Sequence, residues 1–187
     1  MTAKSDETAG ERLPGDLDRR HLIERFIRVD HAGEYGAVRI YSGQLAVLAH
    51  TASAPEIKTM AAQEAEHLAR FDSLVRERGV RPTALAPLWD VAGFALGAAT
   101  ALISEKAAMA CTAAVEEVID AHYAAQIETL GDDEAALRDD LKKFRADEIA
   151  HRDAALAAGA EEAPGYPVLS AAIKAGSHLA IWLSERV

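Results

Sequence analysis

Apolar residues recur at steps of three and four along four long stretches of this sequence, which is the spacing that keeps one face of an α-helix toward a partner. Several glutamates and histidines occupy the same stripes. The stripes comprise Ile27, His31, Glu34, Val38, Tyr41, Leu45 and Leu48 in the first stretch; Ile57, Met60, Glu64, His67, Phe71 and Leu74 in the second; Met109, Thr112, Glu116, Ile119 and Tyr123 in the third; and Leu137, Leu141, Phe144, Glu148, His151 and Ala155 in the fourth. The pattern therefore predicts four helices whose buried faces carry carboxylates and imidazoles.

Turn and cap residues divide the chain into six helical segments, at about 18–50, 55–78, 88–103, 104–130, 132–159 and 168–186. Ser53 and Asp132 are expected to cap the second and fifth segments, and Gly79 is expected to end the second. We predict an all-α fold: a four-helix bundle of two duplicated two-helix units, with two additional helices. No linker divides residues 20–187, so we expect one domain after a flexible segment at 1–19.

Six residues in the stripes form a repeated set in which a lone glutamate is followed by Glu-x-x-His. The six are Glu34, Glu64, His67, Glu116, Glu148 and His151. The two glutamates of each unit lie at nearly the same distance, 30 residues in one unit (34 to 64) and 32 in the other (116 to 148). Such a set, one Glu from each of two helices and one Glu-x-x-His from each of the other two, is typical of a carboxylate-bridged di-iron or di-manganese centre.

Charge balance favours the metal interpretation over a chance arrangement. A single glutamate or histidine on a helix is more often a solvated or core residue, but six in duplicated register are not explained in that way. Buried unpaired carboxylates are costly, whereas two divalent cations balance four of them and neutral histidines complete the coordination. Glu117 follows Glu116 directly but points about 100° away, so we expect it on the surface.

Composition and charge narrow the class of protein. The chain has 187 residues, half of them hydrophobic but only 5% aromatic, which favours closely packed helices in one domain. Its formal net charge of −10 argues against nucleic-acid partners. The single Cys111 cannot form an intramolecular disulfide and is expected to be buried and inert. The N-terminus lacks an apolar run, so it predicts neither a secretory signal nor a transit peptide.

The third helical segment is unusually apolar, with no charge from Val91 to Ile103. These thirteen residues are fewer than the roughly 20 needed to span a bilayer. Two interpretations stay open: a helix buried in the core or in a dimer interface, or a helix that lies on a membrane face together with Trp182 and Leu183. Because the chain is acidic, membrane attachment would be hydrophobic rather than electrostatic. An apolar surface beside the site also favours an apolar substrate.

Other polar residues have weaker claims on the site. Tyr123 is expected to hydrogen-bond a carboxylate or gate electrons, and His31 to orient a ligand, although a structural core histidine is an equal alternative. Asp147 and Asp120 are candidate partners for the ligating imidazoles. His122 lies off the stripe and is not expected to bind metal. Beyond the metal ligands the sequence indicates no catalytic residue, and no Gly-rich fingerprint marks a dinucleotide site.

Several sequence blocks resemble the demethoxyubiquinone hydroxylase family of ubiquinone biosynthesis. They are RVDHAGEYG at 28–36, QEAEHL at 63–68, AVEE at 114–117 with His122 and Tyr123, FRADEIAH at 144–151 and AIWLSER at 180–186. HAGEYGA is far more specific than Glu-x-x-His, and the match extends from about Leu22 to the C-terminus. All six ligand positions hold the residue type that the resemblance implies.

The resemblance implies a ferritin-like, di-iron monooxygenase that hydroxylates the quinone ring of a polyprenylated demethoxyubiquinol with O2, with two Fe ions per chain and NADH as an expected electron source. Glu34, Glu64 and His67 would hold one iron and Glu116, Glu148 and His151 the other, with Glu64 or Glu116 as candidates for bridging. It also implies a peripheral protein on the cytoplasmic face of a bacterial cell membrane. A homo-oligomer or other quinone-biosynthesis proteins are further expected partners.

Two alternatives remain at this stage. A ferritin or rubrerythrin-like protein would use the same ligands for iron oxidation or peroxide decomposition. A membrane-associated scaffold of a quinone-synthesis complex would need no chemistry at all. The prenyl-tail length, the physiological reductant and the oligomeric state are not indicated by the residues.

Overall fold

The computed structural model describes residues 17–187, which form six α-helices and two short 3-10 helices with no strand among them. The elements are α1 Arg19–Leu48, α2 Ala54–Arg78, α3 Ala86–Ile103, α4 Glu105–Thr129, η1 Asp132–Glu134, α5 Ala135–Ala157, η2 Ala160–Glu162 and α6 Tyr166–Ser184. The all-α prediction is therefore confirmed. The expected flexible segment at 1–19 lies outside the described residues except for 17–19, and its boundary stays a prediction.

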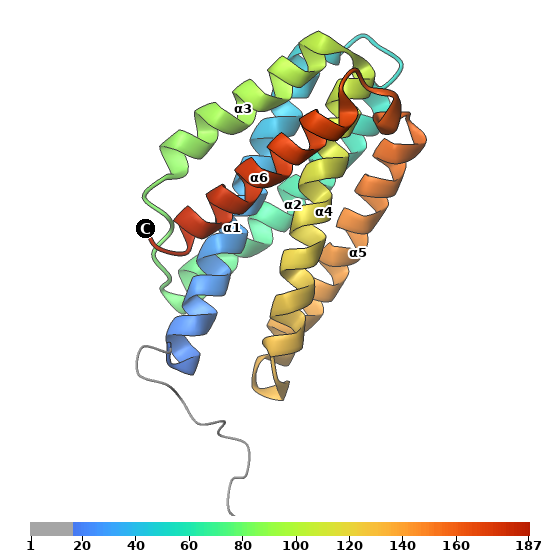
Figure 1. The fold of residues 1–187 in the computed structure, drawn as a ribbon. Helices are drawn as coiled ribbons and strands as arrows, with labels where there is room; N and C mark the ends of the chain where they lie inside the picture. The colour runs from blue at the N-terminus through green and yellow to red at the C-terminus, as the bar shows by residue number, and fades with distance from the viewer. Residues whose placement is uncertain (1–16) are drawn as a thin grey trace, which may run out of the picture.

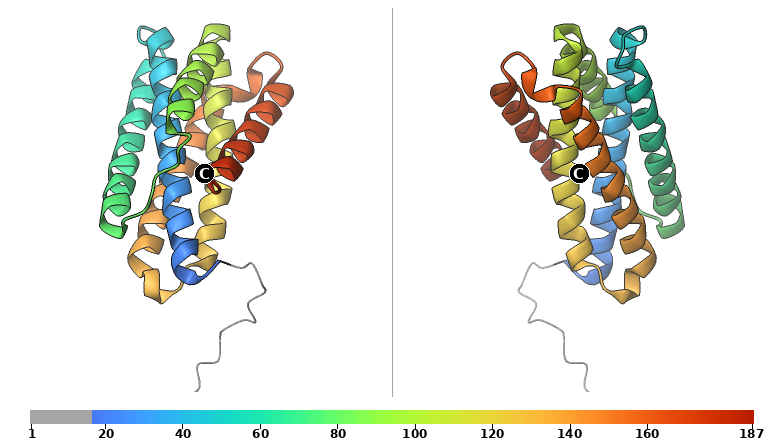
Figure 2. Two further views of the ribbon diagram at one scale, coloured as in Figure 1. Left: turned by 90° about the vertical axis from the view of Figure 1, so that its left-hand side faces the viewer. Right: turned by 90° about the vertical axis from the view of Figure 1, so that its right-hand side faces the viewer.

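Helices α1, α2, α4 and α5 form a four-helix bundle, and the other two helices cover one side of it. Within the bundle α1 packs on α2 and α4 packs on α5, which are the two sequence-duplicated pairs. Helix α3 packs along α1 and α6 packs on α4, so both lie on the same side of the bundle (Figures 1 and 2). This arrangement matches the predicted bundle with two additional helices.

Two apolar clusters fill the bundle and leave a polar layer between them. One cluster is built around Tyr41, Ile57 and Met60, and the other around Phe71 and Phe144. The six repeated glutamates and histidines lie between these clusters along the helices. Because apolar side chains close the bundle on both sides, the polar layer is removed from bulk water.

Two of the three expected helix-terminal residues act differently from the prediction. Gly79 ends α2 in the left-handed region with φ 64°, as predicted. Ser53 precedes α2 but does not cap it: its backbone is helical, and its hydroxyl donates to Glu105 Oε2 at 2.6 Å. Asp132 is also not the cap of α5, because it opens the short helix η1 and Glu134 takes that place.

Helix α3 is an external helix held tightly against α1. A Cβ atom on Gly97 would lie 2.0 Å from Ile40 O, and one on Gly43 would lie 2.1 Å from Phe94 O, so only glycine permits this approach. The helix has 18 residues, and only 17% of it is buried, so the interpretation of a helix buried in the core is wrong, whereas the dimer-interface and membrane-face interpretations stay predictions. Among the described residues, α3 is the one helix long and apolar enough to cross a membrane, by length and composition only.

Candidate metal centre

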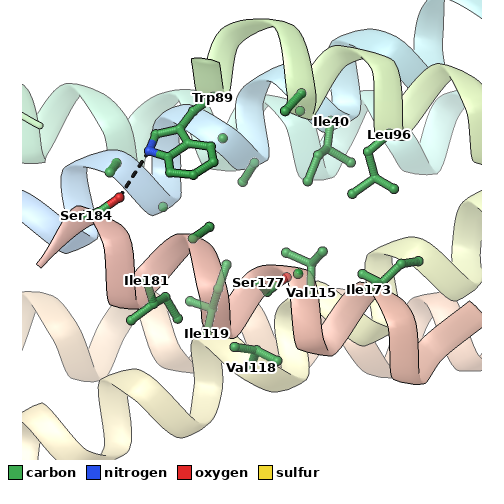
Figure 3. A pocket seen from close by; sticks show the side chains of 18 of the residues that line it. Ile40, Trp89, Leu96, Val115, Val118, Ile119, Ile173, Ser177, Ile181 and Ser184 are labelled. Carbon is green, nitrogen blue, oxygen red and sulfur yellow. Dashed lines mark hydrogen bonds between the residues drawn. The ribbon is translucent and has the colours of Figure 1, made fainter. Parts of the chain in front are cut away.

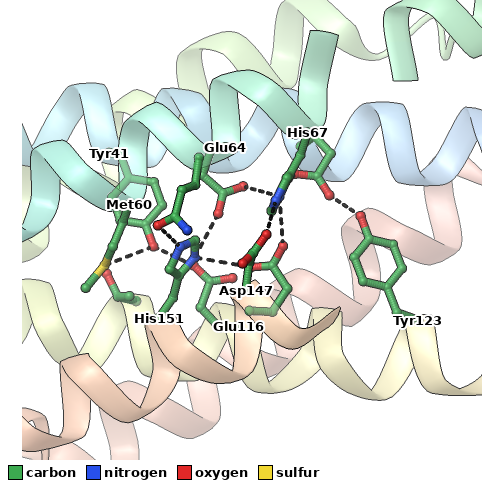
Figure 4. Close-up of polar contacts among 12 residues, drawn as sticks. Tyr41, Met60, Glu64, His67, Glu116, Tyr123, Asp147 and His151 are labelled. Carbon is green, nitrogen blue, oxygen red and sulfur yellow. Dashed lines mark hydrogen bonds and ion pairs between the residues drawn. The ribbon is translucent and has the colours of Figure 1, made fainter. Parts of the chain in front are cut away.

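The structure brings all six repeated residues into one layer inside the bundle. One comes from α1, one from α4, and a Glu-x-x-His pair from each of α2 and α5 (Figure 4). Each is at most 3% exposed. The six are Glu34, Glu64, His67, Glu116, Glu148 and His151. Because their side chains sat on the inward stripes of four different helices, the folding of those helices is enough to gather them.

Two overlapping groups of four residues have ligand atoms within 4.8 Å of one another. The first group is Glu34, Glu64, His67 and Glu148; the second is Glu64, Glu116, Glu148 and His151. Glu64 and Glu148 belong to both groups, whereas Glu116 belongs to one only. Of the shared pair, Glu64 was among the candidates for bridging and Glu148 was not named; the sequence did not indicate which glutamates bridge, and the bridging residues stay a prediction.

The geometry of Glu148 explains why it is shared. Its Oε1 lies 3.2 Å from His67 Nδ1 and its Oε2 lies 3.4 Å from His151 Nδ1. Glu64 spans the same two imidazoles, with Oε1 3.0 Å from His151 Nδ1 and Oε2 3.9 Å from His67 Nδ1. Helices α2 and α5 face each other across the layer, so their glutamates reach both positions. This relation depends on helix packing and cannot be read from spacing alone.

Both histidines direct Nδ1 toward the buried glutamates and Nε2 toward a partner outside the set of six. His67 Nε2 lies 3.1 Å from Asp147 Oδ2, and His151 Nε2 lies 3.0 Å from Gln63 Oε1. These acceptors hold the proton on Nε2, so the Nδ1 lone pair is free to point at a cation. The role expected for Asp147 is therefore observed, while Gln63 was not anticipated.

Unpartnered buried atoms test whether a di-metal centre fits these residues. Among residues 17–187, fourteen buried side-chain N or O atoms lack a hydrogen-bond partner, and eight of them belong to the six residues. The eight are Glu34 Oε2, both oxygens of Glu64 and of Glu148, Glu116 Oε2, and the Nδ1 atoms of His67 and His151. Buried polar groups are normally satisfied. Six side chains that turn their unsatisfied lone pairs toward two points fit a pair of divalent cations with oxygen and nitrogen ligands.

Without cations the layer must hold protons instead. Burial and the neighbouring Glu148 charge raise the pKa values of Glu64 and Glu116 well above the usual range. Burial alone would lower the pKa of His67, but hydrogen bonds to Glu148 and Glu34 outweigh it and bring that pKa to about 10. Cations at the two points would replace these protons, so metal binding should release protons and strengthen as pH rises.

Two tyrosines hold the outer glutamates in a reciprocal arrangement. Tyr123 of α4 donates to Glu34 of α1, and Tyr41 of α1 donates to Glu116 of α4 at 2.7 Å. Each tyrosine follows the glutamate of its own helix by seven residues. The predicted hydrogen bond of Tyr123 is thus observed, but the part played by Tyr41 was missed. The repeated Glu-x6-Tyr spacing is the signal that could have found it.

Other candidates lie elsewhere. His31 hydrogen-bonds Asp72 at 3.0 Å, and within residues 17–187 it forms no hydrogen bond or ion pair with the six residues, so it is not seen to orient a ligand. Asp120 pairs with Arg145 at 2.6 Å instead of with an imidazole. Glu117 is exposed, as expected, with Lys174 at 2.7 Å. Cys111 is fully buried, and burial raises its pKa to about 12, in keeping with an inert thiol.

A second buried polar group lies beside Tyr123 and was not predicted. Gln126 donates to Asp30 Oδ1 at 2.7 Å, and His122 Nε2 lies 3.4 Å from the same oxygen. Burial raises the pKa of Asp30. The hydrogen-bond and ion-pair partners of His122 in the described chain are Asp30 and Gln126, and its exclusion as a metal ligand stays a prediction.

An apolar cavity of about 500 Å³ lies between helices α1 and α4 of the bundle and the covering helices α3 and α6. Its lining comes from α1, α3, α4 and α6, and includes Gly33 and Val115, the chain neighbours of Glu34 and Glu116 (Figure 3). A Cβ on Gly33 would meet no atom within 4 Å. Trp89 Nε1 donates to Ser184 Oγ at 3.1 Å and joins α3 to α6 at one end of this cavity.

Comparison with known proteins gives one consistent family. Residues 21–184 match the family model described as "Ubiquinone biosynthesis protein COQ7". The chain is 60% identical to the 3-demethoxyubiquinol 3-hydroxylase of Rhodospirillum rubrum, over 100% of this chain and 89% of the relative. It is 52% identical to the human NADPH-dependent 3-demethoxyubiquinone 3-hydroxylase, mitochondrial (90% and 79% covered), and 41% identical to the 5-demethoxyubiquinone hydroxylase, mitochondrial, of Saccharomyces cerevisiae (89% and 78%).

Proposed function

The chain belongs to the ubiquinone biosynthesis protein COQ7 family, and from this membership we propose that it is a 3-demethoxyubiquinol 3-hydroxylase, a monooxygenase that acts on a polyprenylated quinol. The observation that carries the proposal is the coincidence of two buried ligand groups with an apolar cavity next to them. Metal ligands alone would also suit iron storage. The adjoining cavity supplies the place for an organic substrate that storage does not need.

The ligand groups suggest how two irons are held. Glu34 and His67 would serve one iron, Glu116 and His151 the other, and Glu64 and Glu148 would be shared between them. Two irons held in this way would supply reductive activation of O2. The protein contributes the fixed positions of the ligands: each imidazole is tied through Nε2, and each outer glutamate is held by a tyrosine hydroxyl.

The cavity accounts for an apolar substrate. It is lined mostly by small and aliphatic side chains, and the lining residues closest in sequence to the buried glutamates are Gly33 on α1, next to Glu34, and Val115 on α4, next to Glu116. We place the quinone ring against Gly33, where it lies nearest to Glu34, and the prenyl tail along the groove between α3 and α6. With iron bound between the six residues, this apolar lining would keep water from one side of the reacting centre and so protect the reaction from unproductive chemistry.

Exposed apolar residues support attachment to a membrane. Nine large hydrophobic side chains are exposed in the described chain, and eight lie on α3, on α6 or at the C-terminus. The eight are Leu88, Val91, Leu102, Ile103, Val168, Leu179, Trp182 and Val187. Patches of this kind mark membrane or protein contacts. We propose that α3 and α6 rest in one leaflet, on the cytoplasmic face of a bacterial cell membrane, and bring the cavity to the lipid-borne quinol.

The way α3 is fixed argues for lying on the membrane rather than crossing it. Its Asp90 pairs with Arg39 of α1 at 2.7 Å and accepts a hydrogen bond from Tyr35 at 2.9 Å. Because α3 runs beside α1 with backbone contact, a crossing orientation would carry the charged residues of α1 into the hydrocarbon. We therefore propose that the eighteen-residue helix α3 lies in the membrane interface instead of spanning the bilayer.

The proposed hydroxylation also needs an electron donor. NADH was expected from the resemblance, whereas the names of several relatives, including the human one, specify NADPH. We propose a nicotinamide as the ultimate reductant and leave the choice to the assay. We also propose a second copy of this chain or other quinone-biosynthesis proteins as partners, because the exposed apolar residues of α3 and α6 suit a protein contact as well as a membrane.

The test is oxygen incorporation measured by mass spectrometry. Iron-loaded protein is incubated with demethoxyubiquinol in detergent micelles under 18O2, with NADH or NADPH in parallel reactions. One 18O in the product supports the hydroxylase. Consumption of Fe(II) without a change in the quinol would favour the iron-oxidation or peroxide alternative.

The matched variant is Glu148→Gln, which keeps the size of the side chain and removes a shared carboxylate. We expect it to fold, as judged by circular dichroism, and to give no labelled product. If this variant restores ubiquinone in a mutant strain that lacks the enzyme, a non-enzymatic scaffold is the better explanation.

A further inference from the structure

The residue before each Glu-x-x-His reaches across the bundle to the histidine of the other motif. Asp147, which precedes Glu148 on α5, accepts from His67 of α2. Gln63, which precedes Glu64 on α2, accepts from His151 of α5. The two contacts have almost the same length, 3.1 Å and 3.0 Å. They are therefore equivalent in geometry but unequal in charge, because one acceptor is a carboxylate and the other an amide.

The other contacts of the two metal positions are similar but not identical: Glu64 Oε1 lies 3.0 Å from His151 Nδ1, whereas Glu64 Oε2 lies 3.9 Å and Glu34 Oε2 lies 3.5 Å from His67 Nδ1. Each outer glutamate accepts a hydrogen bond from one tyrosine, and both positions share Glu64 and Glu148. Each position also has one imidazole directed through Nδ1. Two differences in polar surroundings therefore stand out: the histidine partner, and the Asp30 side chain near Tyr123 on the Glu34 side.

A charged partner changes the histidine as a ligand. A carboxylate that accepts from Nε2–H makes Nδ1 a stronger donor to a cation and adds a negative charge close to the metal. An amide oxygen fixes the same ring orientation without that charge. The half-buried Asp147 lies next to a histidine side chain that is 2% exposed, so water screens their interaction only in part.

We propose that the two iron positions are unequal: the position of Glu34 and His67 binds Fe(II) first and more tightly, and the position of Glu116 and His151 fills second. This inference rests on the proposed function only in requiring that the chain bind iron. Loss of an outer partner of a metal-bound histidine typically lowers metal affinity 10–100-fold. The difference between the two positions should fall in that range, about 10-fold or more.

The test is anaerobic titration of the metal-free full-length protein with Fe(II), in competition with a chromogenic chelator. Wild type should give two dissociation constants that differ by about 10-fold or more. Asp147→Asn, which keeps an acceptor oxygen but removes the charge, should weaken the tighter step until the two constants are nearly equal. Gln63→Glu should strengthen the weaker step. Two equal constants in wild type, or an Asp147→Asn variant in which only the weaker step changes, would overturn the proposal.

A second measurement locates the first iron directly. Crystals of protein that carries one equivalent of Fe(II) are measured at the iron absorption edge, where anomalous scattering marks the metal. The expected peak lies between Glu34 and His67; equal peaks, or a stronger peak beside His151, would refute the order of filling. A protein that binds no Fe(II) in the titration would refute the proposed di-iron function as well, so the two failures are distinguishable.

Discussion

Gly33 offers a way to fill the cavity without disturbing the bundle. It lies on α1 directly before Glu34, lines the cavity, and has open space where a Cβ would be. Gly33→Ala should stabilise the protein by about 1 kcal/mol, because alanine is a better helix former and meets no obstacle. Gly33→Leu should keep most of this gain while its side chain extends into the cavity.

Activity should change in the opposite direction. A single methylene that a pocket cannot accommodate changes discrimination by about 1–3 kcal/mol, or 10–200-fold. The four side-chain carbons of Gly33→Leu should therefore raise the KM for a prenylated demethoxyubiquinol at least ~10-fold, whereas the single methyl of Gly33→Ala should have a smaller effect. The assay combines thermal unfolding with steady-state kinetics in detergent micelles, and iron content is measured for each variant.

The matched control is Gly97→Ala on α3. Its Cβ would lie 2.0 Å from Ile40 O, so this variant should lose stability and activity together, because α3 must move off α1. Equal KM values for wild type and Gly33→Leu, with iron content preserved, would show that the quinone ring does not lie against Gly33 and would refute the proposed position.

Two further predictions concern protons and membranes. In the metal-free protein the pKa values of Glu64 and Glu116 are raised, and the pKa of His67 is raised to about 10. Groups of this kind stabilise the fold while they are protonated and lose that contribution as pH rises through their folded pKa values. The melting temperature of the metal-free protein should therefore fall from about pH 6 to pH 9. Iron should reverse this trend; a metal-free protein that is more stable at pH 9 would contradict the charge argument. Val91→Ser with Leu102→Ser should weaken co-sedimentation with phospholipid vesicles, by about 1.5–3 kcal/mol for each side chain that enters the lipid. Leu17→Ser, an exposed leucine outside α3 and α6, is the control, and equal losses in both would argue against a membrane-facing patch.

Periodicity was enough to predict the bundle and the gathering of the ligands, because inward stripes on four helices must meet in one core. It was not enough to predict the shared pair. Glu116 and Glu148 both lie on inward stripes, and only the facing of α2 and α5 makes Glu148 common to both ligand groups. The same limit applies to Gln63, whose contact crosses from α2 to α5 and leaves no mark in the local sequence.

Helix α3 illustrates a different limit. A charge-free run predicts an apolar environment but does not say whether protein or lipid provides it. The close approach of Gly97 to Ile40 fixes α3 on the outside of α1, and the exposure of Leu102, at 74%, follows from that position. The residue types of α3 therefore predict that the helix is apolar, whereas the close glycine contacts determine which of its faces is covered by α1.

The polar layer of six glutamates and histidines has different neighbours on its two sides. One side faces the proposed substrate cavity, and the other holds the proposed metal-binding histidines. The cavity is lined by residues of α1, α3, α4 and α6, and no described residue of α2 or α5 lines it. The partners that hold the histidines, Gln63 and Asp147, come from α2 and α5 alone. A change on one side should therefore leave the other side intact. Gly33→Leu should alter the quinol KM without altering iron affinity, and Asp147→Asn should alter iron affinity without altering the quinol KM. Sites that share no partner act additively, so the double variant should combine the quinol KM of Gly33→Leu with the iron affinity of Asp147→Asn, and a departure from this combination would mean that the quinol contacts the metal ligands directly.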